Sequence, residues 1–351
     1  MIRVLIADDS PVIQMSLENI LSSDPSIKVV AKARNGQEAV DLAIRTKPDV
    51  ITMDINMPIM DGLEAVREIM QTNPVPVIII SGLMDANDPK DTFKALEAGA
   101  VTIINKPRAL GTKESLIYAK NLIQQVRLLS EIRVIKRFAR TKPVSSGSNK
   151  KNNTVPGPLN PEIIAIAAST GGPLVIQKIL SSLPEGFTIP IVIIQHIVAG
   201  FTLDFARWLG ETSSVPIIIP ENTEEIIPGR CYLAPDGYSL KIRKKHLIYV
   251  QEKKQCICPS ASVLFESIAE EYGASAVGII LTGMGDDGAE ELKKMKHSGA
   301  LTIVQDKNSS VIYGMPGEAV KIGAADLVLT PEEIIKLLAE LNAGNKMSED
   351  V

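Results

Sequence analysis

The stretch IRVLIADDS, residues 2–10, decides how the first half of the chain folds. Its apolar-rich run Ile2–Ala7 leads without alternation into two aspartates, which is typical of a strand buried on both faces of a parallel sheet. Similar runs lie at about 27–33, 49–54, 76–81 and 101–105, separated by stretches of helical periodicity. Sequential strand–helix units of this length predict a doubly wound parallel α/β sheet with right-handed crossovers.

Polar side chains stand where four of these predicted strands end. Asp8 and Asp9 follow the first strand, Asp54 ends the third, Ser81 ends the fourth and Lys106 follows the fifth. Ligands of such sheets bind at the carboxyl ends of the strands. Three carboxylates gathered there would repel one another unless a cation is present, and oxygen ligands of this kind suit Mg2+. Together with a hydroxyl and a lysine, they suggest phosphoryl transfer onto Asp54.

The motifs of residues 1–125 resemble the receiver domain of bacterial response regulators, which has a flavodoxin-like fold. They are Ala7-Asp8-Asp9-Ser10, Met53-Asp54-Ile55-Asn56-Met57-Pro58 with Asp61-Gly62, Ser81-Gly82 and Lys106-Pro107. Any one of these residues alone is better explained as a solvated turn former, so only the complete set indicates a site. The resemblance implies that Asp54 is the phosphoacceptor and that Ser81 and Lys106 contact the phosphoryl group. It also implies that Asp8, Asp9, Asp54 and the Asn56 carbonyl hold the metal ion.

Composition and charge favour a globular chain with room for two domains. The chain has 351 residues, of which 45% are hydrophobic and 22% charged, and its net charge of −4 argues against nucleic acid as a partner. No apolar stretch is long enough to span a bilayer, and the N-terminus enters a strand pattern directly, without a signal peptide. We therefore expect a cytoplasmic protein without membrane insertion.

The three cysteines, Cys231, Cys256 and Cys258, form no disulfide framework, as expected in a reducing cytoplasm. The pair Cys256-x-Cys258 has only two close thiols and no nearby histidine cluster. Ordinary cysteines therefore explain it better than a metal site does.

A change of composition separates the two halves of the chain. The last helix of the first half is expected at about 113–138, and residues 142–153 have almost no apolar side chain to bury. We read the latter as a flexible linker, and favour a solvated linker over a basic docking patch for an acidic partner. The predicted parts are a receiver domain at 1–125, a helix end and linker at 126–160, and a second domain at 161–345.

The second half restarts the alternation of strands and helices. Strands are predicted at 162–168, 190–195, 276–281, 301–304 and 326–329, with a β-rich segment at about 216–250. Helical patterns lie at about 173–182, 201–213, 260–273, 288–297 and 331–342. The expected fold is a second doubly wound domain with a Rossmann-like parallel sheet.

A serine, a histidine and an aspartate-rich turn follow three of these strands. Ser169 lies in a glycine-rich strand-to-helix turn, where backbone N–H groups could form an oxyanion hole. This is the inventory of a serine hydrolase, in which the histidine takes the serine proton and a carboxylate orients the imidazole. The turn is not the G-x-S-x-G elbow of common esterases, and by itself it could equally bind phosphate at a helix N-terminus. His196 ends a buried strand, whereas His246 and His297 are most simply solvated.

The second half resembles the catalytic domain of chemotaxis-type protein-glutamate methylesterases. The matching motifs are Ala168-Ser169-Thr170-Gly171-Gly172-Pro173, Gln195-His196 with Gly200-Phe201-Thr202, Pro228-Gly229-Arg230 with Tyr232-Leu233-Ala234-Pro235, Leu281-Thr282-Gly283-Met284-Gly285 with Asp287-Gly288, and Gln305-Asp306 with Tyr313-Gly314-Met315-Pro316. A receiver, a linker and this domain are the architecture of the family, so the resemblance covers nearly the whole chain.

The resemblance implies a role for each matched position. Ser169 is the expected nucleophile, His196 the base and Asp287 the orienting carboxylate. The neighbouring Asp286 stands where the family motif varies, so Asp287 is the expected member.

Thr170 and Met284 are expected to line the oxyanion region. Three departures from the family pattern bear on substrate preference and packing: Ile197-Val198 after the histidine, Asp236-Gly237-Tyr238-Ser239, and the helix opening at 259–265, which lacks a usual acidic residue.

The expected function is a phosphorylation-controlled hydrolase that removes methyl groups from glutamate γ-methyl esters and releases methanol. The resemblance implies glutamine deamidation as a second activity, methylated chemoreceptor cytoplasmic domains as substrates and a chemotaxis-type histidine kinase as phosphodonor. Mg2+ is expected in the receiver, and no cofactor in the esterase reaction. Two other functional classes are less favoured. One is a transcriptional regulator, which would need a helix-turn-helix and a basic face in the second half. The other is a non-catalytic module that binds a nucleotide at the Ser169 turn.

Overall fold

The computed structural model describes residues 1–81, 90–106, 113–132, 160–197, 199–251 and 258–349. The chain divides into two compact units, Met1–Ser145 and Ser146–Val351. The expected linker, the end of the preceding helix, Val198 and Cys256 lie outside the described residues. The domain boundaries near residues 125 and 160 therefore stay predictions.

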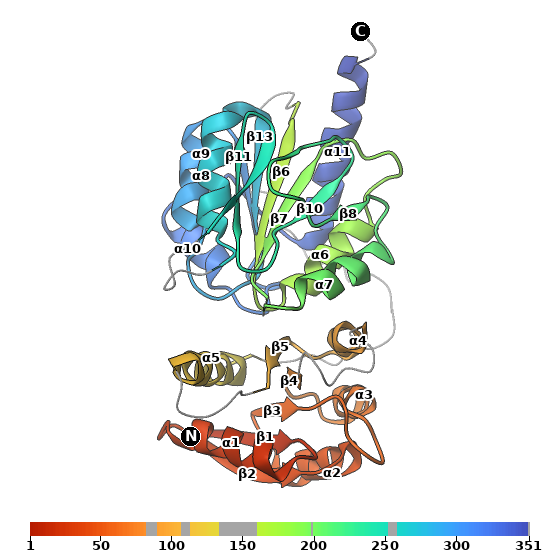
Figure 1. The fold of residues 1–351 in the computed structure, drawn as a ribbon, viewed down its shortest axis with the longest axis vertical. Coiled ribbons are helices and arrows are strands. Elements are labelled where there is room, and N and C mark those ends of the chain that lie inside the picture. The colour runs from red at the N-terminus through yellow and green to blue at the C-terminus, as the bar shows by residue number, and fades with distance from the viewer. Residues whose placement is uncertain (82–89, 107–112, 133–159, 198, 252–257, 350–351) are drawn as a thin grey trace. The chain divides into compact units, whose positions relative to one another are not determined.

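The first unit is the expected doubly wound parallel sheet, in the order β2-β1-β3-β4-β5 (Figure 1). Its elements are β1 (Ile2–Ala7), α1 (Pro11–Ser22), β2 (Ile27–Ala33), α2 (Gly36–Thr46), β3 (Val50–Met53), α3 (Gly62–Thr72), β4 (Val77–Ser81), α4 (Lys90–Ala98), β5 (Thr102–Asn105) and α5 (Lys113–Ser130). This strand order is that of flavodoxin-like folds. It brings the carboxyl ends of β1, β3, β4 and β5 to one edge.

Side-chain caps begin three of these helices. The side chains of Ser10, Asn35 and Asp61 each accept a hydrogen bond from a backbone N–H in the first turn of α1, α2 and α3. Such caps satisfy donors that the helix itself leaves unpaired. They therefore fix where each helix starts relative to the strand before it.

The second unit contains a parallel sheet in the order β15-β14-β13-β6-β7-β10-β8, seven strands in the described residues. Its elements are β6 (Ile163–Ala168), α6 (Gly172–Ser181), β7 (Ile191–Gln195), α7 (Thr202–Gly210), β8 (Ile217–Ile218), β9 (Glu224–Glu225), β10 (Cys231–Leu233), β11 (Ser239–Arg243), β12 (His246–Val250), α8 (Ala261–Glu271), β13 (Ala276–Ile280), α9 (Ala289–His297), β14 (Leu301–Gln305), α10 (Met315–Lys321), β15 (Leu327–Leu329) and α11 (Pro331–Glu349). The chain runs outward from β6 to β10, then returns to the other side of β6 for β13. The doubly wound prediction is confirmed, and the reversal lies between β6 and β13.

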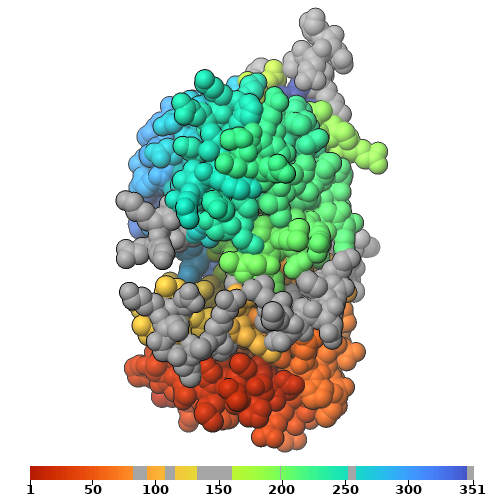
Figure 2. Space-filling view, viewed as in Figure 1, coloured from red at the N-terminus to blue at the C-terminus, as the bar shows by residue number. Residues whose placement is uncertain are grey.

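The β-rich segment of the second unit divides between two sheets. β10 pairs with β7 and β8 in the parallel sheet, whereas β9, β11 and β12 form a separate antiparallel sheet. Figure 2 shows a face of this unit on which the green to teal segment after β7 forms most of the surface. The short helix α10 had no counterpart among the expected helices, because its seven residues are too few for a clear periodic pattern.

Apolar side chains from the sheets and helices fill the core of each unit. In the second unit Tyr232, Phe205 and Phe265 are among the largest fully buried side chains. Helices α8, α9 and α10 lie on one side of the sheet and α6, α7 and α11 on the other (Figure 1). Within the described ranges, no helix combines the length and the apolar character that a bilayer crossing needs.

Candidate functional site

Two expected site residues of the second unit lie side by side at the carboxyl edge of the sheet. Ala168 pairs with Gln195 in the β6–β7 ladder, so Ser169 and His196 stand at the same level on neighbouring strands. The His196 N–H donates to the carbonyl of Ala168 at 2.9 Å. On the other side of β6, the Ser169 N–H donates to the carbonyl of Thr282 at 3.0 Å. Strand order thus brings three sequence-distant turns together.

His196 contacts Asp287 through the ring nitrogen that lies farther from its backbone. Nε2 is 2.9 Å from the Asp287 Oδ2, and the two side chains are only 13% and 8% exposed. When Nε2 carries the proton that it donates to this carboxylate, Nδ1 is left as the acceptor. Ser169 and His196 share no direct hydrogen bond, an arrangement common in catalytic pairs before substrate binds. Asp286, the alternative carboxylate, is exposed.

The N-terminus of α8 holds the Asp287 carboxylate. Its two oxygens accept from the Ala261 N–H at 2.7 Å, the Ser262 N–H at 3.1 Å and the Ser260 hydroxyl at 3.1 Å. In return the Ser262 hydroxyl accepts from the N–H of Gly288 at 3.0 Å. The contact of these serines with Asp287 was not among the expectations, although a serine before a helical run is a recognisable cap signal.

The same contacts keep Asp287 ionised. Burial alone would raise the pKa of its carboxyl, but the hydrogen bond and charge of His196, the Ala261 N–H and Ser262 together lower that pKa to about 2. A charged carboxylate at this place stabilises an imidazolium on His196. The arrangement therefore suits a histidine that gains a proton during a reaction.

Close backbone packing fixes the turn that carries Ser169. A Cβ on Gly283 would lie 2.7 Å from the Ser169 Cβ and 2.5 Å from the Met315 Sδ, so only glycine fits there. The buried Thr282 hydroxyl donates to the carbonyl of Thr170 at 3.0 Å and accepts from the Ile312 N–H at 2.9 Å. The turn is thereby tied to both neighbouring segments.

The expected oxyanion residues flank this turn. Thr170 is buried directly after Ser169, and Met284 is half-buried after the β13 strand end. Because the Ser169 N–H is already bonded to Thr282, an oxyanion site here would draw on other N–H groups.

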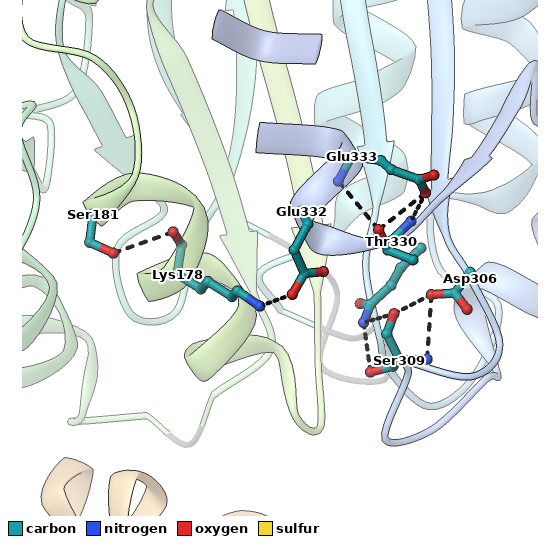
Figure 3. Close-up of polar contacts among 8 residues, drawn as sticks. Lys178, Ser181, Asp306, Ser309, Thr330, Glu332 and Glu333 are labelled. Carbon is teal, nitrogen blue, oxygen red and sulfur yellow. Dashed lines mark hydrogen bonds and ion pairs between the residues drawn. The ribbon is translucent and has the colours of Figure 1, made fainter. Parts of the chain in front are cut away.

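Figure 3 shows further polar contacts of the second unit, at α6, at α11 and in the loop after β14. Lys178 and Glu332 form an ion pair that joins α6 to α11, and Ser309 contacts Asp306 in the loop after β14. Thr330 and Glu333 cap the start of α11 reciprocally. The Lys178–Glu332 pair is well exposed, and such pairs contribute little stability. These contacts support the backbone rather than supply reacting groups.

In the first unit, the structure brings the three expected acidic residues together. Asp8, Asp9 and Asp54 each offer a carboxylate oxygen, and these oxygens lie within 4.8 Å of one another. Asp8 and Asp54 are buried, while Asp9 is exposed. Lys106 Nζ is 3.0 Å from the Asp54 Oδ2 and 3.9 Å from the Asp8 Oδ2.

These carboxylates are poorly neutralised by the chain alone. The pKa of Asp8 is raised to about 6, mainly because its carboxyl is buried. The hydrogen bond from the Ser10 N–H lowers this pKa, and the charge of Asp54 raises it. Burial also raises the pKa of Asp54, against the charge and hydrogen bond of Lys106. The buried Asp8 Oδ2 has no hydrogen-bond partner among the described residues. An oxygen-ligand cation such as Mg2+ fits this donor set.

The remaining residues of the expected phosphorylation site follow or lie near neighbouring strands. Ser81 is buried at the end of β4, and its carbonyl accepts from the Lys106 N–H at 2.8 Å. Asn56 is exposed two residues after Asp54.

Both units match known protein families. The CheB methylesterase family matches residues 164–338, and the response regulator receiver domain matches residues 4–116. A protein-glutamate methylesterase/protein-glutamine glutaminase of Syntrophus aciditrophicus is 44% identical, over 97% of this chain and 98% of that protein. One from Geobacter metallireducens is 45% identical, over 97% and 99%. The crystal structure of the Thermotoga maritima CheB methylesterase catalytic domain is 34% identical, covers 52% of this chain and 100% of that chain, and has a TM-score of 0.49.

Proposed function

Because the chain belongs to the protein-glutamate methylesterase/protein-glutamine glutaminase family and carries a response regulator receiver domain, we propose that it is a phosphorylation-activated hydrolase. It removes methyl groups from glutamate γ-methyl esters of chemoreceptors, releases methanol, and deamidates receptor glutamines. The substrates are the cytoplasmic domains of methylated chemoreceptors, so the reaction takes place in the cytoplasm. A transcriptional regulator would need a DNA-binding element in the second half, where the family match is a hydrolase.

The observation that carries the proposal is the 2.9 Å contact between His196 and Asp287 beside the buried Ser169 turn. In the proposed reaction His196 Nδ1 takes the Ser169 hydroxyl proton while the serine oxygen attacks the ester carbonyl. Asp287 stabilises the imidazolium that forms. The imidazolium then protonates the departing methoxide. Methanol is released, and Ser169 remains acylated by the glutamate side chain.

Water completes the cycle at the same residues. His196 takes a proton from water, the resulting oxygen nucleophile attacks the acyl-serine, and Ser169 recovers its proton as the glutamate carboxylate is released. With a glutamine side chain, ammonia replaces methanol as the leaving group. Thr170 and Met284 line the place where negative charge develops on the carbonyl oxygen. The esterase reaction, as proposed, needs only these side chains and water.

The first unit is the proposed control element. Asp54 accepts a phosphoryl group from a chemotaxis-type histidine kinase, and Asp8, Asp9, Asp54 and the Asn56 carbonyl hold Mg2+. Mg2+ would neutralise negative charge on the phosphoryl group during transfer. The Asp8 Oδ2, which accepts no hydrogen bond from the described residues, supports this ligand set. Lys106 and Ser81 then contact the phosphoryl group on Asp54.

Methanol release from methylated receptor membranes tests the proposal. The full chain should release methanol faster with a small phosphodonor and Mg2+ than without them, and Ser169→Ala should release essentially none. Asn342→Leu is a matched control, because Asn342 lies on α11 and its side chain bonds Thr188. Release by Ser169→Ala at the wild-type rate would refute the proposed nucleophile.

A further inference from the structure

Gln195, the last residue of β7, ties together the two turns of the proposed active site. Its side chain is 5% exposed. The amide Nε2 donates to the carbonyl of Ser169 at 2.9 Å and to the carbonyl of His196 at 2.9 Å. One side-chain nitrogen thus bridges the backbone of the proposed nucleophile and that of the proposed base.

This bridge stands where the strands separate. The β6–β7 ladder ends with Ala168 paired to Gln195 and with the His196 N–H bonded to the carbonyl of Ala168. Beyond that point Ser169 turns into α6, and its carbonyl accepts from the Gly172 N–H at 2.8 Å. Among the described residues, no further ladder bond joins the segments that leave β6 and β7, and the side-chain amide of Gln195 connects them instead.

The space around Gln195 is built for an amide. A Cβ on Gly172 would collide with the Gln195 Oε1 and with the Ala168 Cβ, so the glycine admits the side chain. Oε1 itself is buried and has no hydrogen-bond partner among the described residues. A buried unpaired acceptor costs stability. An apolar side chain of similar length would avoid this cost, so the amide is explained by its two donor bonds.

A second buried glutamine gives a useful contrast. Gln305, at the end of β14, accepts from the Thr282 N–H at 2.8 Å and donates to Ser309. Both ends of its amide are therefore paired, as in an ordinary structural crosslink. In Gln195, by contrast, only Nε2 is hydrogen-bonded to the described residues, and it donates to the carbonyls of Ser169 and His196.

We propose that Gln195 is a positioning residue that sets the separation of the Ser169 hydroxyl from the His196 imidazole. This inference rests on the proposed function of that pair. Gln195 acts on the backbone of both residues and does not touch substrate. Without its two bonds the turns can move apart, and misplacement of reacting groups by about 1 Å costs on the order of 100-fold in rate. The loss should therefore fall on kcat rather than on KM.

Two substitutions in the full chain distinguish a positioning role of Gln195 from a role in packing alone. Gln195→Met keeps the length of the side chain and removes both donors. Gln195→Glu keeps the shape and places an acceptor opposite the two carbonyls. Asn342→Leu is the control, because it also removes a buried amide with two hydrogen bonds, to the Thr188 N–H and hydroxyl. Thr188 precedes β7, at the opposite edge of the sheet.

Three measurements are needed: kcat and KM for methanol release from methylated receptor membranes, the rate at which phenylmethanesulfonyl fluoride modifies Ser169, and the melting temperature. We expect both Gln195 variants to lose about 100-fold in kcat and in the rate of Ser169 modification, with KM within about twofold. Asn342→Leu should lower the melting temperature by a similar amount and leave both rates within about twofold.

The outcomes distinguish this inference from the proposed function. If either folded Gln195 variant keeps both rates within threefold of the wild type, the positioning role is overturned. If the wild type releases no methanol but its Ser169 is modified rapidly, the proposed substrate is wrong. The positioning role of Gln195 is then tested by the rates of Ser169 modification alone. A wild type that neither releases methanol nor reacts at Ser169 would overturn both.

Discussion

His196 presents Nε2, the ring nitrogen farther from the backbone, to Asp287 at 2.9 Å. Ser169 follows β6 at the same level as His196 on the neighbouring strand β7. The carboxylate is in turn fixed by the start of α8. The orientation of the imidazole therefore depends on a helix that begins more than 60 residues after the histidine in the sequence.

The three residues of the proposed triad should behave as one unit. Ser169→Ala, His196→Ala and Asp287→Asn should each lower kcat by roughly 1000-fold or more, and the losses should not add in double variants. Methanol release by single and double variants measures this. Asp286→Asn is the matched control, because Asp286 is adjacent but exposed, and should be near normal. The reverse pattern, with Asp286→Asn severe, would reassign the carboxylate.

Because of Asp287, the free energy of unfolding of the second unit should decrease at acid pH. The pKa of Asp287 in the folded chain is about 2, against 3.8 as the ordinary value, so its ionised form stabilises the fold. That contribution, about 2 kcal/mol, is present above about pH 4 and is lost as pH falls through about 2. Urea unfolding of the wild type and Asp287→Asn should differ most near neutral pH and converge in acid. A difference that stays constant down to pH 2 would contradict the assignment.

Gly283→Ala should disturb the turn of the proposed nucleophile directly. The added Cβ would come within 2.7 Å of the Ser169 Cβ, so Ser169 must shift. We expect kcat to fall at least tenfold. Gly210→Ala is the control, since nothing lies within 4 Å of a Cβ there, and its kcat and melting temperature should be near wild type. Equal activity of the two variants would show that the turn tolerates displacement.

Asp54 should be phosphorylated only when Mg2+ is present. The purified chain should be labelled by a small phosphodonor, and Asp54→Asn should not. Mg2+ should also raise the melting temperature of the first unit, because it binds the folded acidic cluster. Asp8→Asn should abolish that rise and stabilise the metal-free chain, since it removes a buried carboxylate whose Oδ2 accepts no hydrogen bond from the described residues. Equal labelling of Asp54→Asn would exclude it as the phosphoacceptor.

We expect the unphosphorylated receiver to inhibit the hydrolase, so removal of the receiver should increase the rate of methanol release. A tether gives the receiver a high effective concentration at the second unit. A fragment beginning near Leu159 should then exceed the unphosphorylated full chain in methanol release and ignore the phosphodonor. A tenfold difference corresponds to about 1.4 kcal/mol between the two states. A fragment no more active than the full chain would favour activation by direct contact instead.

The sequence by itself determined most of the architecture. Continuous β-branched runs such as residues 77–80 predict strands buried on both faces, and the structure confirms both doubly wound sheets. Polar residues directly after those strands could also be expected to share an edge, because parallel strands end together. Asp8, Asp54 and Lys106 do so, and Ser169 and His196 lie side by side.

Only the tertiary structure decided which atoms of the site meet. Asp287 was already the expected carboxylate, but its contact with His196 Nε2 and the hydrogen bonds of Ser260 and Gln195 depend on how α8 and the strand-end turns pack. These contacts join residues far apart in the sequence, and their geometry follows from side-chain rotamers and loop closure. The periodicity of a strand constrains neither the rotamers nor the loop closure. It shows only which face of the local backbone is buried, and it does not show which residues of other segments pack against that face.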